Sequence, residues 1–244
     1  MLYILPVKTL FGNFQEKVLK ALAGKIDDFY LAGGTALSLY YFHHRESVDL
    51  DFFTRKFDKV RVTETVKLIS DSLHKKTKLV AENSGKGKVR VAIYFIAINK
   101  DKSLKIDFVE DYLGLIKPPE LINGIKVMSL EDIYSRKIYC LTGTAWPEDS
   151  IGRKAAIGGR QEAKDFYDMY CLSSIFMRLS DFAFKLGSQA IREALVRWFR
   201  TYSRMDIKTG LLELNLKKNI DYADLERHFK KEVDKILEKE VESI

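Results

Sequence analysis

The chain has 244 residues, of which 46% are hydrophobic, 12% aromatic and 31% charged, with a formal net charge of +7. This composition excludes collagen-like, low-complexity and intrinsically disordered proteins, because enough apolar surface is present to offset the conformational entropy of folding. No apolar run is long enough to span a membrane, and residues 1–10 contain Pro6 and Lys8 and do not predict a signal peptide. Two cysteines, Cys140 and Cys171, form neither a disulfide framework nor a zinc pattern, so we expect a cytoplasmic protein.

The positive charge is concentrated in the first half of the chain. Residues 1–128 hold 21 basic and 15 acidic side chains, whereas residues 129–244 hold 20 and 19. Residues 55–105 alone hold 14 basic and 5 acidic side chains. Such a local excess attracts polyanions such as nucleic acids or nucleotides. Charge alone still favours the alternative, a lysine-rich surface that only keeps the protein soluble.

The predicted elements alternate between helix and strand up to about residue 128 and are helical afterwards. In chain order, strands are predicted at 29–32, 48–54, 78–82, 90–98, 103–109 and 124–128, and helices at 14–23, 36–42, 62–74, 129–141, 161–173, 188–203 and 222–241. A loop at 142–159 interrupts the helical part. The sequence therefore predicts a mixed α/β domain at 1–128 and an all-α domain at 129–244.

Paired glycines lie between the first predicted strand and the helix that follows it. Gly33 and Gly34 permit a positive φ and a close approach of a ligand to the backbone. The amides of such a turn favour a phosphate group, and the Thr35 hydroxyl would be a further donor. A turn without a ligand is the alternative.

Two aspartates interrupt the next apolar strand. Because side chains alternate along a strand, Val48, Leu50 and Phe52 are expected to face the core, and Asp49 and Asp51 the opposite side. Aspartate is depleted in strands, so the presence of two aspartates in one apolar strand needs an explanation. The two Cα atoms would lie roughly 6.5–7 Å apart, close enough to share a divalent cation or to hold two. The alternative is an exposed face with two ordinary charges.

A third carboxylate lies on a later strand. Leu104, Ile106 and Phe108 are expected to face the core, which leaves Asp107 on the opposite side. If this strand lies beside the first, the three carboxylates need counter-charge, which Mg²⁺ with its oxygen ligands supplies. A surface aspartate beside Lys105 is the alternative.

A lysine interrupts the apolar stripe of the helix that begins after Ser129. Lys137 either extends to water or meets an anion, because an unpaired buried ammonium is costly. On the helix at 161–173, Asp165 and Asp168 share a face and are expected to be partly buried and partnered. The candidate partners are Lys137 and the basic residues of the preceding loop, Arg153, Lys154 and Arg160.

Three arginines recur at helical spacing near the end of the chain. Arg197, Arg200 and Arg204 form either a ridge that faces RNA or, as the sequence alone favours, a solvated helix face. His43 and His44 lack the spacing of metal ligands, so we expect structural or surface residues and no zinc site.

The order of these motifs resembles the nucleotidyltransferase superfamily with a polymerase-β-like palm, and more specifically the AbiEii/AbiGii toxin family. The resemblance is carried by LAGGTAL at 31–37, HRESVDLDFF at 44–53, Lys137 and KDFYD at 164–168. It implies a nucleotidyltransferase that moves a nucleoside monophosphate from an NTP to an acceptor hydroxyl and releases pyrophosphate, with Mg²⁺ or Mn²⁺. Family members are toxins of toxin–antitoxin modules and some modify tRNA 3′ ends, which implies an RNA acceptor and an antitoxin partner.

The resemblance also implies roles for individual residues. Asp49 and Asp51 would bind metal, and Asp107 would bind a second metal and help to activate the acceptor hydroxyl. Lys137 would neutralise triphosphate charge, and Asp165 would be an acid/base or a partner of that lysine. The NTP phosphates would be cradled by Gly33, Gly34 and Thr35.

Two other functions remain open at this point. One is a nucleotidyltransferase that modifies a small molecule such as an aminoglycoside, against which the basic stretch at 55–105 argues. The other is a nucleotide- or partner-binding module without turnover. A site that has lost its activity has no physical need for clustered carboxylates, which argues against the second.

Overall fold

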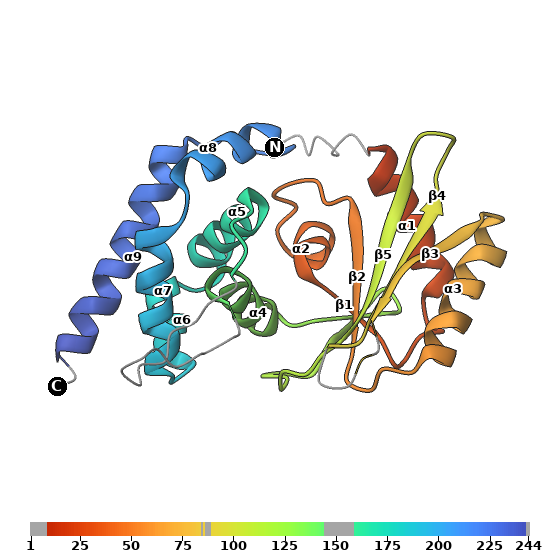
Figure 1. Cartoon of the computed structure of the whole chain (residues 1–244), viewed down its shortest axis with the longest axis horizontal. Helices are drawn as coiled ribbons and strands as arrows, with labels where there is room; N and C mark the ends of the chain where they lie inside the picture. Colours follow the sequence, from red (N-terminus) through yellow and green to blue (C-terminus); the bar gives the residue numbers. More distant parts are fainter. Residues whose placement is uncertain (1–8, 84, 86–88, 144–158, 243–244) are drawn as a thin grey trace. The chain divides into compact units, whose positions relative to one another are not determined.

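The structure, a computed structural model, describes residues 9–83, 85, 89–143 and 159–242. These residues divide into two compact units (Figure 1): the first is Met1–Tyr41 with Glu46–Ser129, and the second is Phe42–Arg45 with Leu130–Ile244. The predicted loop residues Arg153 and Lys154 lie outside the described residues. No helix in the described ranges is long and apolar enough to cross a membrane.

The first unit is built on a mixed sheet with the strand order β3-β4-β5-β2-β1-β7-β6. β2 pairs in parallel with β5 and antiparallel with β1, so it lies inside the sheet. The expected mixed α/β fold is confirmed. The strands are β1 (Tyr30–Ala32), β2 (Asp49–Thr54), β3 (Thr77–Asn83), β4 (Val91–Ala97), β5 (Ser103–Glu110), β6 (Glu120–Ile122) and β7 (Ile125–Val127).

Two helices, α1 (Leu10–Leu22) and α3 (Lys59–Leu73), lie together on one side of this sheet (Figure 1). α3 begins where the Asp58 carboxylate accepts a hydrogen bond from the Val60 amide, and it ends at His74, whose φ is 50°. The core of the unit contains the stacked rings of Phe52 and Phe108, with centroids 5.7 Å apart. Complete burial of one such side chain contributes about 1.5–3 kcal/mol to folding.

The strand with the aspartate pair begins one residue later than expected. Val48 precedes β2 and is 45% exposed, so its predicted core position is wrong. Leu50 and Phe52 are fully buried, as the alternation requires. The core-facing positions of β2 therefore continue to Thr54, whose side chain is also buried.

The short strand β6 is not predicted by the apolar pattern. It pairs antiparallel with β7 through a turn at Asn123 and Gly124, which have φ values of 50° and 78°. Leu121 on β6 is 71% exposed. An Asn-Gly pair with two positive φ values is the usual turn of a two-residue hairpin. This pair is therefore the sequence feature from which the strand could have been predicted.

The second unit consists of helices around an aromatic core. The ring of Phe166 lies 5.4 Å from that of Trp198, 5.0 Å from that of Tyr202 and 4.7 Å from that of Phe229, measured between centroids. The predicted helical character of this part is confirmed. The elements are α4 (Leu130–Thr142), α5 (Ala163–Cys171), the π-helical segment η2 (Leu172–Phe176), α6 (Leu179–Lys185), α7 (Gln189–Thr201), α8 (Arg204–Glu213) and α9 (Tyr222–Glu242).

The predicted arginine ridge is not on one helix. α7 ends at Thr201, and the Ser203 hydroxyl accepts a hydrogen bond from the Asp206 amide and begins α8. Arg204 therefore lies on α8, where its Nε is 2.7 Å from Glu226. The three arginines, which recur at helical spacing in the sequence, therefore do not share one helix face, because the serine cap separates the two helices.

Candidate active site

The three strand aspartates lie on one face of two neighbouring strands. β2 and β5 are paired in parallel so that Asp49 lies opposite Lys105 and Asp51 opposite Asp107. The two strands are neighbours, which is the condition under which the third carboxylate joins the pair. We call these four residues the charged quartet. The alternate residues of the two strands are buried in the core, namely Leu50, Phe52, Leu104, Ile106 and Phe108. The backbone therefore fixes the four side chains of the quartet on the other face.

Lys105 is the cation of the charged quartet. Its Nζ lies 2.5 Å from Oδ2 of Asp107. Burial opposes the charged form of the lysine, but the hydrogen bond to Asp107 and then the charges of Asp107, Asp49 and Asp51 raise its pKa. One ammonium group therefore compensates part of the charge of three carboxylates.

The donor atoms of the quartet are carboxylate oxygens, whose chemistry bears on whether this face could hold a divalent cation. In the part of the chain that the structure describes, no group of three or more His, Cys, Asp or Glu side chains is arranged to hold a metal ion. The three carboxylates nevertheless share a face and already share one cationic partner. Carboxylate oxygens are the ligands that Mg²⁺ and Mn²⁺ prefer, so the chemistry of the set suits such an ion.

The glycine turn approaches one of these carboxylates closely. Ala32 at the end of β1 pairs with Asp51, and the next residue, Gly33, has a φ of 67°. A Cβ atom at Gly33 would lie 2.6 Å from Oδ2 of Asp51. A side chain at this position would therefore displace the carboxylate, which explains why the turn needs glycine here.

The beginning of β2 is held by two buried polar side chains. The fully buried Thr35 donates a hydrogen bond of 2.6 Å to the Asp49 carbonyl, and its Oγ1 lies 2.7 Å from Oγ of Ser47. Gln15 on α1 donates to the carbonyls of Asp49 and Ser47 at 2.8 and 3.0 Å. The Thr35 hydroxyl therefore positions the strand, and its role as a phosphate donor stays a prediction. Sequence patterns gave no signal for Gln15 or Ser47.

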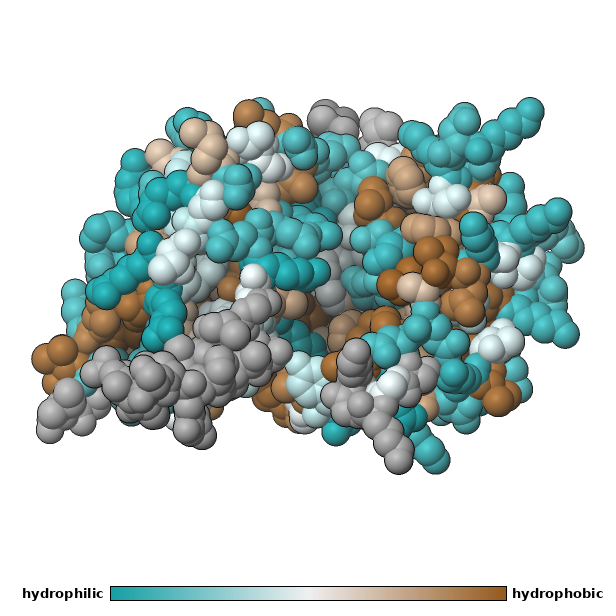
Figure 2. All heavy atoms as spheres, viewed as in Figure 1, coloured by the Kyte–Doolittle hydropathy of each residue, from teal (hydrophilic) through white to brown (hydrophobic). Residues whose placement is uncertain are grey.

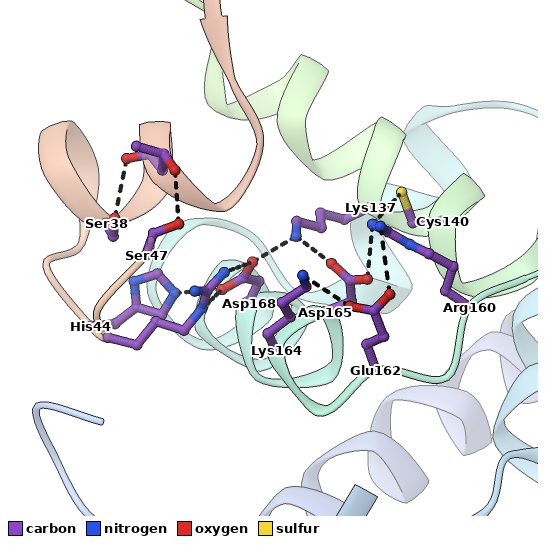
Figure 3. A network of polar contacts seen from close by, with 12 residues as sticks. Ser38, His44, Ser47, Lys137, Cys140, Arg160, Glu162, Lys164, Asp165 and Asp168 are labelled. Carbon is purple, nitrogen blue, oxygen red and sulfur yellow. Dashed lines mark hydrogen bonds and ion pairs between the residues drawn. The ribbon is translucent and has the colours of Figure 1, made fainter. Parts of the chain in front are cut away.

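In the second unit, Lys137 is buried between two carboxylates (Figure 3). Its Nζ lies 2.5 Å from Oδ1 of Asp165 and 2.6 Å from Oδ2 of Asp168. Burial opposes the charge of this lysine, but Asp168 and Asp165 outweigh burial and raise its pKa. Arg160 also lies 2.9 Å from Asp165. Of the candidate partners, Lys137 therefore pairs with both aspartates, and Arg160 of the preceding loop pairs with Asp165.

Asp168 has two further partners from a distant part of the sequence. Arg45 donates from Nε and Nη2 to its two oxygens at 2.7 and 2.8 Å, and Nε2 of His44 lies 2.7 Å from Oδ1. Burial raises the pKa of Asp168, but Lys137 and Arg45 outweigh it and hold the pKa well below its usual range. Together with Asp165 these residues form a buried ion network. The sequence predicts a structural or a surface position for His44, and the residue is buried.

Residues 17–244 match the family described as "Nucleotidyl transferase AbiEii toxin, Type IV TA system". The chain belongs to this family. The AbiEii family consists of nucleotidyltransferase toxins of toxin–antitoxin systems, which confirms the resemblance that the motifs indicate.

One relative of this AbiEii-family chain is an uncharacterised protein of Aquifex aeolicus, 30% identical over 160 residues. That match covers 64% of this chain and 62% of the length of the relative. JHP933 from Helicobacter pylori has a similar structure, with a TM-score of 0.59 and 17% identity over 96% of this chain and 94% of that one. MenT4, a nucleotidyltransferase toxin from Mycobacterium tuberculosis, has a TM-score of 0.56 and 15% identity over 93% of this chain and 84% of that one. At these identities the two structures support the fold.

Proposed function

We propose that this AbiEii-family protein moves a nucleoside monophosphate from an NTP to a hydroxyl group of RNA, with tRNA as the expected acceptor. The acceptor oxygen forms a bond to the α-phosphorus, the bond from that phosphorus to the oxygen that bridges it to the β-phosphorus breaks, and pyrophosphate leaves. The observation that carries this proposal is the charged quartet on β2 and β5 with the backbone of Gly33 against Asp51. We propose that the protein acts in the cytoplasm as a toxin with an antitoxin partner.

The quartet supplies what this transfer needs, which is positioning and charge neutralisation more than covalent catalysis. Asp49, Asp51 and Asp107 would hold Mg²⁺ or Mn²⁺, which when bound neutralises developing charge and polarises the phosphate. Asp107 is our proposed acceptor for the proton of the attacking hydroxyl. The amides at Gly33 and Gly34 are our proposed contacts to the phosphates.

Lys137 is our proposed cation for the triphosphate, with Asp165 as its partner or as an acid/base. The electrostatics of the second unit support this role. Within the described residues of that unit, ion pairs connect four cations with three carboxylates: Lys137, Arg45, Arg160 and Lys164 with Asp165, Asp168 and Glu162. The surplus of one positive charge suits a phosphate ligand.

The RNA acceptor is supported by the basic excess at 55–105. The cytoplasmic location is supported by the two cysteines, Cys140 and Cys171, which are both free thiols. A small molecule as acceptor would not explain the basic excess.

The direct test is incubation with Mg²⁺, each α-labelled NTP in turn and total tRNA, resolved on a denaturing gel. We expect labelled RNA with at least one NTP and a loss of about 100-fold or more in Asp51→Asn and Asp107→Asn. Asp101→Asn is the matched control, because Asp101 is exposed in the turn before β5. Pyrophosphate release without labelled RNA would indicate that the acceptor is a small molecule and not RNA. No pyrophosphate release with any acceptor would overturn the proposal.

A further inference from the structure

Lys105 occupies an unusual position for a lysine in a site proposed to hold metal. It lies directly opposite Asp49 across the β2–β5 pair and two residues before Asp107 on the same face. Its ammonium contacts Asp107 at 2.5 Å. A cation is therefore already present among the carboxylates to which the proposed function assigns the metal.

We propose that Lys105 is a built-in counter-ion that holds the charged quartet together without metal and gives up Asp107 when a divalent cation binds. This inference rests on the proposed function, because that proposal assigns the metal to Asp49, Asp51 and Asp107. Three carboxylates on one face repel each other, and the ammonium lowers the charge of the quartet from −3 to −2. The lysine therefore stabilises the metal-free site and competes with the metal.

The geometry indicates which partner moves. The Lys105 side chain is 33% exposed, whereas that of Asp107 is 13% exposed. A lysine has a flexible four-carbon stem and can move its ammonium into water at little cost. Asp107 is held by its strand between the buried residues Ile106 and Phe108. The ammonium is therefore the group that leaves.

This arrangement has a consequence for substrate binding. A metal that arrives alone must displace Lys105 and then lie near a second positive charge, which weakens its binding. A metal that arrives with an NTP brings phosphates. Their oxygens can accept hydrogen bonds from the Lys105 ammonium after it leaves Asp107. Lys105 would thus make metal loading depend on the nucleotide.

The test is titration of the nucleotide-free protein with Mn²⁺, with free Mn²⁺ measured by electron paramagnetic resonance. We expect Lys105→Met to lower the Kd for Mn²⁺ about tenfold or more, because a like charge is removed from the site. Lys105→Arg should bind as weakly as the wild type. Lys78→Met is the matched control, since Lys78 is an exposed lysine of the same sheet on β3. It should leave the Kd within about twofold, as expected for a surface charge.

A second measurement covers the possibility that Lys105→Met fails to fold. In EDTA, Lys105→Gln should have a lower Tm than the wild type, and excess Mn²⁺ should restore most of the difference. Mn²⁺ binding that is lost in Asp51→Asn but has the wild-type Kd in Lys105→Met and Lys105→Gln would overturn this inference and leave the proposed function intact. Failure of wild-type and variant proteins to bind Mn²⁺ with or without NTP would overturn both.

Discussion

At the scale of single residues, Gly33 determines where the Asp51 carboxylate can lie. Its φ of 67° and the 2.6 Å approach of a Cβ atom to Asp51 are two separate constraints. We expect Gly33→Ala to lose about 1–2 kcal/mol of stability through the left-handed backbone and about 100-fold of transfer activity through displacement of the carboxylate.

Gly24 offers a control that separates these two constraints. It has a φ of 70°, but a Cβ atom there would meet nothing within 4 Å. Gly24→Ala should therefore lose similar stability and keep its activity, as measured by thermal unfolding and by transfer to labelled RNA. Equal activity of the two variants would show that the close approach to Asp51 has no catalytic importance.

Asp168 predicts a pH dependence of stability. Its folded pKa lies below the unfolded value of about 3.9, so the stability it contributes is present above that value and is lost as the pH falls toward the folded pKa. Asp168→Asn leaves Lys137 and Arg45 buried without this charge, which costs about 3–5 kcal/mol at pH 7. Urea unfolding should show this difference in the free energy of unfolding between the wild type and Asp168→Asn at pH 7, and a smaller difference at pH 3.

The exposed pair of Asp224 and Arg227 is the control for this prediction. Its side chains are 56% and 75% exposed, so Asp224→Asn should cost less than about 1 kcal/mol. A difference for Asp168→Asn that stays constant between pH 7 and pH 3 would show that packing, and not charge, accounts for the loss.

The residues of the site differ in how far the sequence could predict them. Asp49, Asp51 and Asp107 are carboxylates at the outward positions of apolar strands, and Lys137 interrupts the apolar stripe of a helix, so each is visible against a local pattern. Arg45 has no such signal, because its partner lies 123 positions away in the chain. A pairing of that separation depends on the tertiary fold.

At the scale of elements, strong periodicity predicted well and weak periodicity did not. The alternation in β2 and β5 predicted which side chains are buried. α8 was missed because Ile207 and Leu211 are its buried residues, which is too few for a recognisable stripe. α6 was missed because it has seven residues. Length and burial, more than propensity, decided which elements could be predicted.

Six apolar residues repeat at helical spacing along α9 in the sequence, and the first four of them are buried while the last two are exposed. Leu225, Phe229, Val233 and Ile236 are buried, whereas Leu237 and Val241 are 38% and 73% exposed. Apolar side chains are visible at that end of α9 in Figure 2. The helix continues beyond the core that its first turns cover, so periodicity alone overestimates the buried stripe.

This helix provides a prediction at the element scale. Phe229 is fully buried, with its ring 5.4 Å from Trp198 and 4.7 Å from Phe166. Phe229→Ala should cost about 3–5 kcal/mol, whereas Leu237→Ala on the same helix should cost less than about 1 kcal/mol. Chemical denaturation of both variants checks this. Similar losses would mean that the exposed end of α9 is packed in solution.

At the scale of the whole molecule, the two units do not follow the order of the sequence strictly. The four residues Phe42–Arg45 belong to the helical unit although they lie between two parts of the sheet unit. They carry the His44 and Arg45 side chains to Asp168. The predicted elements change from mixed helix and strand to helix alone near residue 128. The sequence has no pattern that indicates that these four residues belong to the helical unit.

The distribution of charge gives a prediction about the acceptor. If RNA binds to the basic stretch at 55–105, its affinity should fall with salt, with a slope of about −0.7 to −0.9 in log–log form for each phosphate contacted. Reversing the exposed lysines Lys67, Lys76 and Lys100 to glutamate should weaken tRNA binding and reduce this slope.

The same number of charges reversed in the second half, at Lys208, Lys217 and Lys218, is the control, since these lysines are also exposed. Filter binding of labelled tRNA at several salt concentrations measures both sets. A larger effect of the first set would assign RNA binding to 55–105, because net charge changes equally in both. Equal effects would indicate attraction by the overall charge of +7. Affinity independent of salt would exclude phosphate contacts as the source of binding.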